Sequence, residues 1–427
     1  MKLYSSGEPD WQQQLDSATN NAMSAKQNLL SAAVVVAALG YFVDVYDLVL
    51  FLVVKDPSLI DLGISPDNIL ESGAFLLNCQ NGGMLVGGLL WGLLGDKIGR
   101  TKVLFGSIVM YSLANICNAF VGSLDMYALL RFIAGVGLAG ELGAGVTLVA
   151  ELMPPKLRGY GTTIIAGVGA FGAIAAGLIG DVVPWRYSYL IGGALGLLLL
   201  FLRVSVAESE LFKAVHERGS SMRDILRIML APRRLVRFFQ CILLGVPIWY
   251  IIGILLANSK DISKALGVLD APKIGLCIAI CYSGLLVGDI AGGLLSQYLK
   301  SRKRPIAIFI SLSNVLPLWL LTRTDLSLLG FYSNLFLIGF AGGYWVLVVT
   351  LAAEQFGTNV RATVTTSIPN FIRGAVVPVS VVFLSLRPAY GIIDSAIIVG
   401  LSVCGIATVC LFTISETFSR DLDFVEK

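Results

Sequence analysis

Long apolar runs recur along the whole chain and are separated by short polar segments. Each run is close to the roughly 20 residues that a helix needs to cross the ~30 Å hydrocarbon core of a bilayer. The apolar positions are continuous, whereas the strands of a membrane barrel would alternate over about ten residues. The pattern therefore predicts an all-α membrane protein with twelve transmembrane helices. These lie at residues 30–54, 71–95, 101–121, 126–150, 161–182, 186–204, 236–257, 273–297, 305–322, 327–350, 363–386 and 391–414.

A charged segment at residues 205–235 separates the first six apolar runs from the last six. Its apolar residues recur at helical spacing, which predicts an amphipathic linker on the cytoplasmic surface of the membrane. A plain charged linker is the alternative. We expect five parts: a cytoplasmic N-terminal segment (1–29), a six-helix half (30–204), the linker (205–235), a second six-helix half (236–414) and a cytoplasmic tail (415–427).

The two halves contain an internal repeat. In the first half Glu151 is followed seven residues later by Arg158, and in the second half Glu354 is followed seven residues later by Arg361. The segment 293–302 is a weaker echo of 92–100. Two six-helix halves of the same orientation form a parallel repeat about an axis along the membrane normal, and such proteins bind substrate between the halves near the midplane.

Composition excludes several classes of protein. Hydrophobic residues make up 56% of the chain and charged residues only 14%, with a mean hydropathy of +0.81. Soluble domains hold roughly 45–50% apolar and about 25% charged residues. A soluble enzyme, a disordered protein and a nucleic-acid binder are therefore excluded. The single histidine, His216, and seven cysteines scattered in apolar runs cannot build a catalytic triad or a metal site. We expect no enzymatic activity, and no signal peptide in the polar segment 1–29.

Basic residues predict the orientation in the membrane. If the N-terminus is cytoplasmic, 22 of the 31 lysines and arginines lie at or beside inner segments, seven lie at outer segments, and Arg131 and Arg373 lie within helices. The positive-inside rule therefore places both termini in the cytoplasm. Short loops favour a bacterial inner membrane.

Several motifs resemble those of the major facilitator superfamily. The segment Gly92–Lys102 (GLLGDKIGRTK) resembles in full the signature that joins the second and third helices of that family. Asp44–Asp47 (DVYD) is similar to the aspartate-tyrosine-aspartate element of phosphate:proton and organic-acid symporters. Further segments resemble the sugar-porter and metabolite:proton symporter branches, namely 131–141, 151–159, 208–212 and 416–422. The resemblance implies a twelve-helix fold of two pseudo-symmetric halves that transports by alternating access.

Four charged residues within helices are candidates for proton coupling. A charge at the centre of a bilayer costs about 2.5–3.5 kcal/mol even on the lenient insertion scale, so it should face a cavity or a partner. Asp47 and Arg131 lie at similar depth, roughly 8–11 Å below the outer surface at 1.5 Å per residue. The resemblance to sugar symporters implies that they pair. We expect Asp47 to accept the transported proton under the control of Arg131; a static ion pair is the alternative. Asp44 and Glu141 are further candidate proton sites.

Arg373, near the middle of the eleventh predicted helix, is the candidate substrate ligand. A guanidinium is a planar fork that binds carboxylate or phosphate with two hydrogen bonds. Asn370 lies one turn earlier on the same face. The alternative is a structural pairing of Arg373 with Asp289 on the eighth helix, although their predicted depths differ by several ångström.

Amide and aromatic side chains are candidate walls of the substrate pocket. Helices 1, 4, 7 and 10 line the cavity in the fold that the resemblance implies. The candidates on the second, seventh and tenth helices are Asn78, Asn81, Trp249, Tyr250, Tyr344 and Trp345. Ordinary packing against lipid or neighbouring helices is the alternative for each aromatic residue.

Charges of both signs also gather at the cytoplasmic ends of the predicted helices. The resemblance implies that they form an inner gate, whose ion pairs close when the cavity opens outward. The predicted gate residues are Asp96, Arg100, Glu151, Arg158, Glu354 and Arg361. For Glu151 and Arg158 a local helix cap is the alternative.

These observations predict a monomeric transporter in the lipid bilayer that takes up a small organic anion with protons as coupling ion. Di- or tricarboxylates and other polycarboxylates are the expected substrates. Phosphate or sugar symport and a proton-driven exporter of the same fold are the alternatives. A sensor that binds without transporting would need a longer cytoplasmic domain than residues 205–235 or 415–427 provide. We expect no other cofactor, no metal and no nucleic-acid partner.

Overall fold

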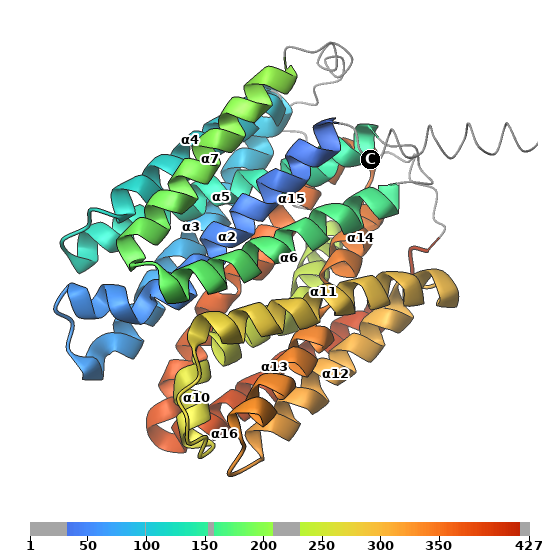
Figure 1. Cartoon of the computed structure of the whole chain (residues 1–427). Coiled ribbons are helices and arrows are strands. Elements are labelled where there is room, and N and C mark those ends of the chain that lie inside the picture. Colours follow the sequence, from blue (N-terminus) through green and yellow to red (C-terminus); the bar gives the residue numbers. More distant parts are fainter. Residues whose placement is uncertain (1–31, 99, 153–157, 208–230, 419–427) are drawn as a thin grey trace, which may run out of the picture.

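The computed structural model describes residues 32–98, 100–152, 158–207 and 231–418, which fold into an all-α bundle (Figure 1). The first half contains six long helices that fall on the first six predicted runs. They are α2 (Ala32–Asp61), α3 (Ile69–Ile98), α4 (Arg100–Asn118), α5 (Leu124–Leu152), α6 (Arg158–Val182) and α7 (Trp185–Ala207), with a short turn η1 (Pro66–Asn68) before α3. The helix α2 runs seven residues past its predicted end because Ser58 and Leu59 are still buried in the bundle.

The second half is more segmented than the apolar pattern predicts. It contains α9 (Pro232–Tyr250), a π-helical turn η2 (Ile251–Leu256), α10 (Ser259–Ala265), α11 (Ile274–Leu299), α12 (Lys303–Leu321), α13 (Leu328–Gly342), α14 (Trp345–Gln355), α15 (Thr358–Gly374) and α16 (Val376–Thr413). Helix α9 begins inside the segment that we predicted as linker, most of which lies outside the described residues.

Two breaks divide these helices. A continuous helix of 38 residues such as α16 would be about 57 Å long, far more than one crossing needs. Gly391, with φ 73° and ψ 179°, interrupts α16 and separates the eleventh crossing from the twelfth. In the tenth crossing α13 ends at Gly342, and α14 begins three residues later at Trp345. With these breaks the described residues form the twelve predicted crossings.

Eight helical segments among the described residues are long and apolar enough to cross a membrane, and the longest of them, Thr363–Thr413, contains both crossings beside Gly391. The three remaining predicted runs lie in α3, α4 and α5, which are also helical. The protein is therefore an all-α, multi-pass membrane protein.

The two halves meet along two helix pairs, α6 with α11 and α3 with α15 (Figure 1). Glycines allow the close approach. A Cβ on Gly177 would lie 2.4 Å from the carbonyl oxygen of Gly275, and one on Gly88 would lie 2.9 Å from the Cβ of Asn370. Small residues at membrane helix interfaces let backbones approach and gain van der Waals contact, since lipid supplies no hydrophobic driving force between helices.

Polar side chains also join the halves at one end of the bundle. We call this the outer end, following the predicted orientation; it holds the α2–α3, α6–α7 and η2–α11 connections. The Asp181 carboxylate accepts hydrogen bonds from the amides of Gly275 (3.0 Å) and Leu276 (3.1 Å), so the first half caps the start of α11. Lys55 of α2 donates to the carbonyl of Ala257 (3.2 Å) at the end of η2. An acid at a helix start and a base at a helix end both complement the helix dipole.

Candidate functional site

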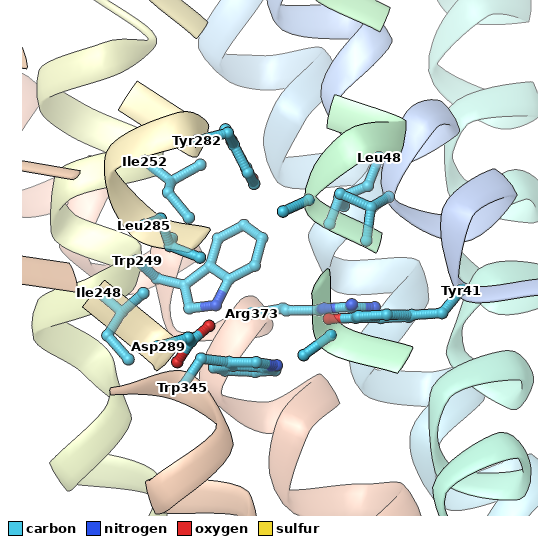
Figure 2. Close-up of a pocket in the computed structure, with 13 residues that line it drawn as sticks. Tyr41, Leu48, Ile248, Trp249, Ile252, Tyr282, Leu285, Asp289, Trp345 and Arg373 are labelled. Atoms are coloured by element: carbon cyan, nitrogen blue, oxygen red, sulfur yellow. The ribbon is translucent and has the colours of Figure 1, made fainter. Parts of the chain in front are cut away.

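A cavity lies between the two halves, and Figure 2 shows the side chains that line it. Both halves supply its walls. It is lined by Tyr41, Val45, Leu48, Ala166, Ala170, Ile248, Trp249, Ile252, Tyr282, Leu285, Asp289, Trp345 and Arg373. Most of these side chains are aliphatic or aromatic, and only two of them are charged. Such a mainly apolar cavity with a few polar groups is typical of a site for a small organic molecule.

An ion pair across the two halves lies at this cavity. Nη2 of Arg373, on α15, is 3.0 Å from Oδ2 of Asp44, on α2. Both side chains are buried, with exposed fractions of 1% and 0%. The Nε and Nη1 atoms of Arg373 and Oδ1 of Asp44 have no hydrogen-bond partner among the described residues. The guanidinium therefore keeps free donors while its charge is compensated, a combination suited to receiving an anionic ligand.

Two tryptophans flank Arg373. Its guanidinium carbon lies 6.0 Å from the ring centroids of both Trp249 and Trp345. The two indoles are 6.5 Å apart at an interplanar angle of 69°, an edge-to-face arrangement. Cations lie favourably over aromatic faces at such distances. Two of the six predicted pocket walls therefore line the cavity together with the predicted substrate ligand.

Asp289 does not pair with Arg373. Its Oδ1 accepts a hydrogen bond from the amide of Val346 (3.3 Å) in the first turn of α14. This contact exists because the tenth crossing breaks at Gly343, whose backbone packs so closely on α11 that a Cβ would lie 2.4 Å from Gly288. The first amides of α14 are thereby brought to Asp289, where they have no partner within their own helix. The alternative pairing considered from sequence is thus wrong, and Asp44 is the partner that sequence reasoning did not assign.

Asp47 and Arg131 are also both buried, but no nitrogen–oxygen pair between them is within 4.0 Å in the described structure. Arg131 instead donates a hydrogen bond to Oε1 of Gln80 on α3. Its guanidinium carbon lies 4.9 Å from the centroid of Phe51 and 5.7 Å from that of Tyr189. The predicted ion pair is therefore absent from this structure. The prediction rested on estimated depth, which does not supply the lateral direction in which each side chain points.

Two of the predicted pocket amides connect helices instead of lining the cavity. Nδ2 of Asn370 donates to the carbonyl of Ala139 on α5 (2.8 Å). The hydroxyl of Ser380 on α16 donates to Oδ1 of Asn78 on α3 (2.8 Å). Both contacts cross between the halves. These amides stabilise the interface beside the cavity.

The remaining predicted pocket and proton residues lie elsewhere in the bundle. The hydroxyl of Tyr250 donates to the carbonyl of Ala396 (2.8 Å), and that of Tyr344 donates to the carbonyl of Leu244 (3.2 Å), both within the second half. Two further residues are buried away from the lining set, namely Asn81 on α3 and Glu141 on α5.

One predicted gate residue is described with its side chain. The carboxylate of Glu354 accepts hydrogen bonds from the guanidinium of Arg302 (2.9 and 3.2 Å) and from the hydroxyl of Thr417 (2.6 Å). Arg302 ends the segment 293–302 that weakly echoes the first-half signature, so the echo still supplies an arginine. The other five gate side chains lie outside the described part of the structure, namely those of Asp96, Arg100, Glu151, Arg158 and Arg361.

Glu416, in the predicted tail, closes the same end of the second half. Its carboxylate accepts hydrogen bonds from the amides of Arg302 (2.9 Å) and Lys303 (3.2 Å) and from the hydroxyl of Ser301. Partial burial on its own would raise the pKa of Glu416, but these hydrogen bonds to the charged form outweigh it and lower the pKa to about 2. The residue therefore caps α12 as a carboxylate.

Comparisons with known proteins agree with this architecture. The family model of the Major Facilitator Superfamily matches residues 37–376. A Haemophilus influenzae protein named for metabolite transport is 28% identical over 78% of this chain and 83% of its own length. A Bacillus subtilis protein named for niacin and nicotinamide transport is 27% identical over 76% and 71%. The benzoate transport protein of Acinetobacter baylyi is 24% identical over 77% and 78%.

Proposed function

Because the chain belongs to the major facilitator superfamily, whose members are multi-pass membrane transporters and not enzymes, we propose that it imports a small aromatic carboxylic acid together with a proton. The site of action would be the bacterial inner membrane, with both termini in the cytoplasm. The observation that carries the proposal is the Arg373–Asp44 ion pair of 3.0 Å, which bridges the halves beside an aromatic cavity.

The lining of the cavity supports a substrate with one carboxylate and a flat apolar body. Arg373 is the only basic residue among the described residues that line it, so a second or third carboxylate would have no cation to bind. The indoles of Trp249 and Trp345 offer faces and edges for an aromatic ring. Relatives named for niacin and for benzoate transport support the same class. We therefore propose a monocarboxylate in place of the polycarboxylate expected from sequence.

Partner exchange at Arg373 would couple the proton to the substrate. In the empty carrier Asp44 forms an ion pair with Arg373. An entering carboxylate binds the guanidinium in its place. Asp44 is then buried without a cation, and a buried unpaired carboxylate costs free energy unless it takes up a proton. The loaded site then carries one substrate anion and one proton, and the ionic link between α2 and α15 is gone. The halves are thereby released to open to the other side. Release of substrate and proton restores the pair.

A direct test measures proton uptake on substrate binding by the purified wild-type protein. Benzoate or nicotinate is added to the detergent-solubilised protein in weakly buffered solution at neutral pH. We expect one proton to be taken up for each carboxylate bound. Binding without proton uptake would contradict the coupling, and absence of binding by any aromatic acid would contradict the substrate class.

Proteoliposomes test direction and residue roles. We expect labelled substrate to accumulate when the outside is acidic and to be lost on adding a protonophore. Asp44→Asn should still exchange labelled for unlabelled substrate but should no longer accumulate it. Asp394→Asn, which changes an exposed aspartate three residues after the break at Gly391, is the matched control and should behave as wild type. Accumulation by Asp44→Asn would remove Asp44 from the coupling step, and export driven by the same gradient would favour the exporter.

A further inference from the structure

Asp289 is the second charged residue of the cavity, and the proposed coupling cycle does not use it. Its side chain comes from α11 and has an exposed fraction of 7%. No lysine or arginine nitrogen lies within 4.0 Å of its carboxylate in the described structure. In Figure 2 its carboxylate lies between the rings of Trp249 and Trp345, whereas the guanidinium of Arg373 lies to the right, at the ring of Tyr41. The cavity is therefore polar at two separate places.

The carboxylate of Asp289 is only partly satisfied by the protein. It accepts hydrogen bonds from two backbone amides at the start of α14, that of Val346 at a long 3.3 Å and that of Trp345, so two of its acceptor positions are used. A carboxylate can accept about four hydrogen bonds, so acceptor capacity remains on the side that faces the cavity. Buried polar groups that lack partners cost free energy, and a ligand that supplies a donor recovers it. A ligand group that is itself negative would be repelled there.

We propose that Asp289 selects ring substituents: the cavity takes aromatic acids that carry a hydroxyl or N–H donor away from the carboxylate. This inference rests on the proposed function. Arg373 receives the carboxylate, Trp249 and Trp345 contact the ring, and Asp289 accepts the hydrogen bond of the donor. Asp289 also excludes dicarboxylates, because their second carboxylate would face its own charge. Asp289 is thus a specificity residue, separate from the coupling pair.

The experiment compares binding constants by calorimetry for five ligands: benzoate, 3-hydroxybenzoate, 4-hydroxybenzoate, 4-methoxybenzoate and terephthalate. The methoxy compound keeps the ring oxygen but has no donor and is one methyl group larger. We expect at least one hydroxybenzoate to bind wild type roughly tenfold more tightly than 4-methoxybenzoate, the ratio typical of a hydrogen bond to a charged group. Terephthalate should bind at least tenfold more weakly than benzoate.

Two variants of Asp289 distinguish a role in substrate specificity from a role in stabilising the fold. Asp289→Asn keeps an oxygen for the Val346 amide but loses the negative charge, and we expect it to bind terephthalate more tightly than wild type does. Asp289→Ala should lose the preference for hydroxybenzoate. Benzoate, which has no donor on its ring, is the reference ligand, and every dissociation constant is compared as its ratio to that of benzoate for the same variant.

The outcomes distinguish this inference from the proposed function. Equal binding of the hydroxy and methoxy compounds to wild type would overturn the role of Asp289 and leave the proposed function intact. Survival of the hydroxyl preference in Asp289→Ala would do the same. Failure of every benzoate to bind wild type would overturn both. If Asp289→Ala does not fold, the terephthalate constant of Asp289→Asn decides alone, since an unchanged rejection contradicts charge exclusion.

Discussion

Asp44 and Asp47 lie within one turn of α2, but the arginine nearest to each lies in a different part of the molecule. Asp44 pairs at 3.0 Å with Arg373 of the other half, beside the cavity. Asp47 lies in the first half with Arg131, which binds Gln80 and two aromatic rings instead. Three residues along a helix turn a side chain by about 60° at 3.6 residues per turn. This rotation directs one carboxylate to the substrate site and the other to the interior of a single half.

The role of a buried charged residue therefore depends on its partner and not on its residue type. Arg373 lines the cavity, where a ligand can compete with Asp44 for its guanidinium. Asp44 belongs to the other half of the molecule. Arg131 is enclosed by groups of its own half and does not line the cavity. We therefore expect Asp44 and Arg373 to control transport and Arg131 to control stability. The predictions below test this division, from the largest expected effect to the smallest.

The largest effect should come from removing one member of the pair that bridges the halves. Arg373→Gln leaves Asp44 buried without a cation, and removing one partner of such a pair costs about 3–5 kcal/mol in the free energy of unfolding. The double variant Asp44→Asn/Arg373→Gln removes both charges and should recover most of that stability. Chemical unfolding measures both.

Neither of these two variants should bind or transport the substrate, because the guanidinium is absent from both. If the double variant transported at the wild-type rate, Arg373 would be a structural residue only. If the double variant were as unstable as Arg373→Gln, the destabilisation would come from lost packing and not from the unpaired charge.

An intermediate effect on stability, without an effect on substrate affinity, should come from Gln80→Leu. This variant removes the acceptor of a hydrogen bond from the buried guanidinium of Arg131. Hydrogen bonds to charged groups contribute about 1.5–3 kcal/mol, so the free energy of unfolding should fall by about 2 kcal/mol. Gln80→Glu, which supplies a charged acceptor, is the matched control and should retain the wild-type value.

This division of roles fails if Gln80→Leu weakens substrate binding as much as it weakens the fold. Calorimetry with the substrate and unfolding in denaturant, on the same preparation, give the two quantities. A change in the dissociation constant of more than about tenfold would show that Arg131 and Arg373 act as one system.

A smaller effect should come from a contact that joins the halves outside the cavity. Asp181→Ala removes both side-chain hydrogen bonds that the first half gives to the start of α11. Loss of a helix cap costs about 1 kcal/mol. We expect the melting temperature to fall slightly while substrate affinity is unchanged, and Asp181→Asn, which keeps one acceptor oxygen, should lie between. A loss of affinity like that of Arg373→Gln would mean that any contact between the halves matters, whether or not it touches the cavity.

The smallest effect concerns Glu416. Its pKa is lowered to about 2 in the folded protein from 4.5, so it stabilises the fold above pH 4.5 and loses that contribution as the pH falls toward 2. The carboxylate is accessible to solvent, so Glu416→Gln should cost less than about 1 kcal/mol at pH 7. The difference in melting temperature between variant and wild type should shrink below pH 4.5.

Glu416→Gln also sharpens the assignment of the coupling proton. Because Glu416 is fully ionised between pH 5 and 8, the pH profile of transport in that range should be the same in the variant and in wild type. Measured initial rates in proteoliposomes decide this. A displaced profile would show that the cap of α12 takes part in coupling, contrary to the role given to Asp44.

The sequence alone determined the number of crossings, the placement of the break near residue 391 and six of the seven charged side chains that are buried among the described residues; Lys55 was expected at an outer segment. Continuous apolar runs have few solutions in a bilayer, since every backbone polar group there must be paired within a helix. It also made Arg373 a candidate site residue, because a charge near the midplane is costly without a cavity or a partner. Trp249 and Trp345 were candidates because of the helices on which they lie, as the resemblance implied.

Only the tertiary structure decided which charges meet. A rise of 1.5 Å per residue converts sequence into depth, and depth alone made Asp47 a partner for Arg131. The direction of each side chain, and the identity of the neighbouring helix, depend on how the two halves pack. That packing brings Asp44 to Arg373 and Arg131 to Gln80. It also breaks the tenth crossing beside Asp289, where close contact of Gly343 with α11 stops one helix and starts the next.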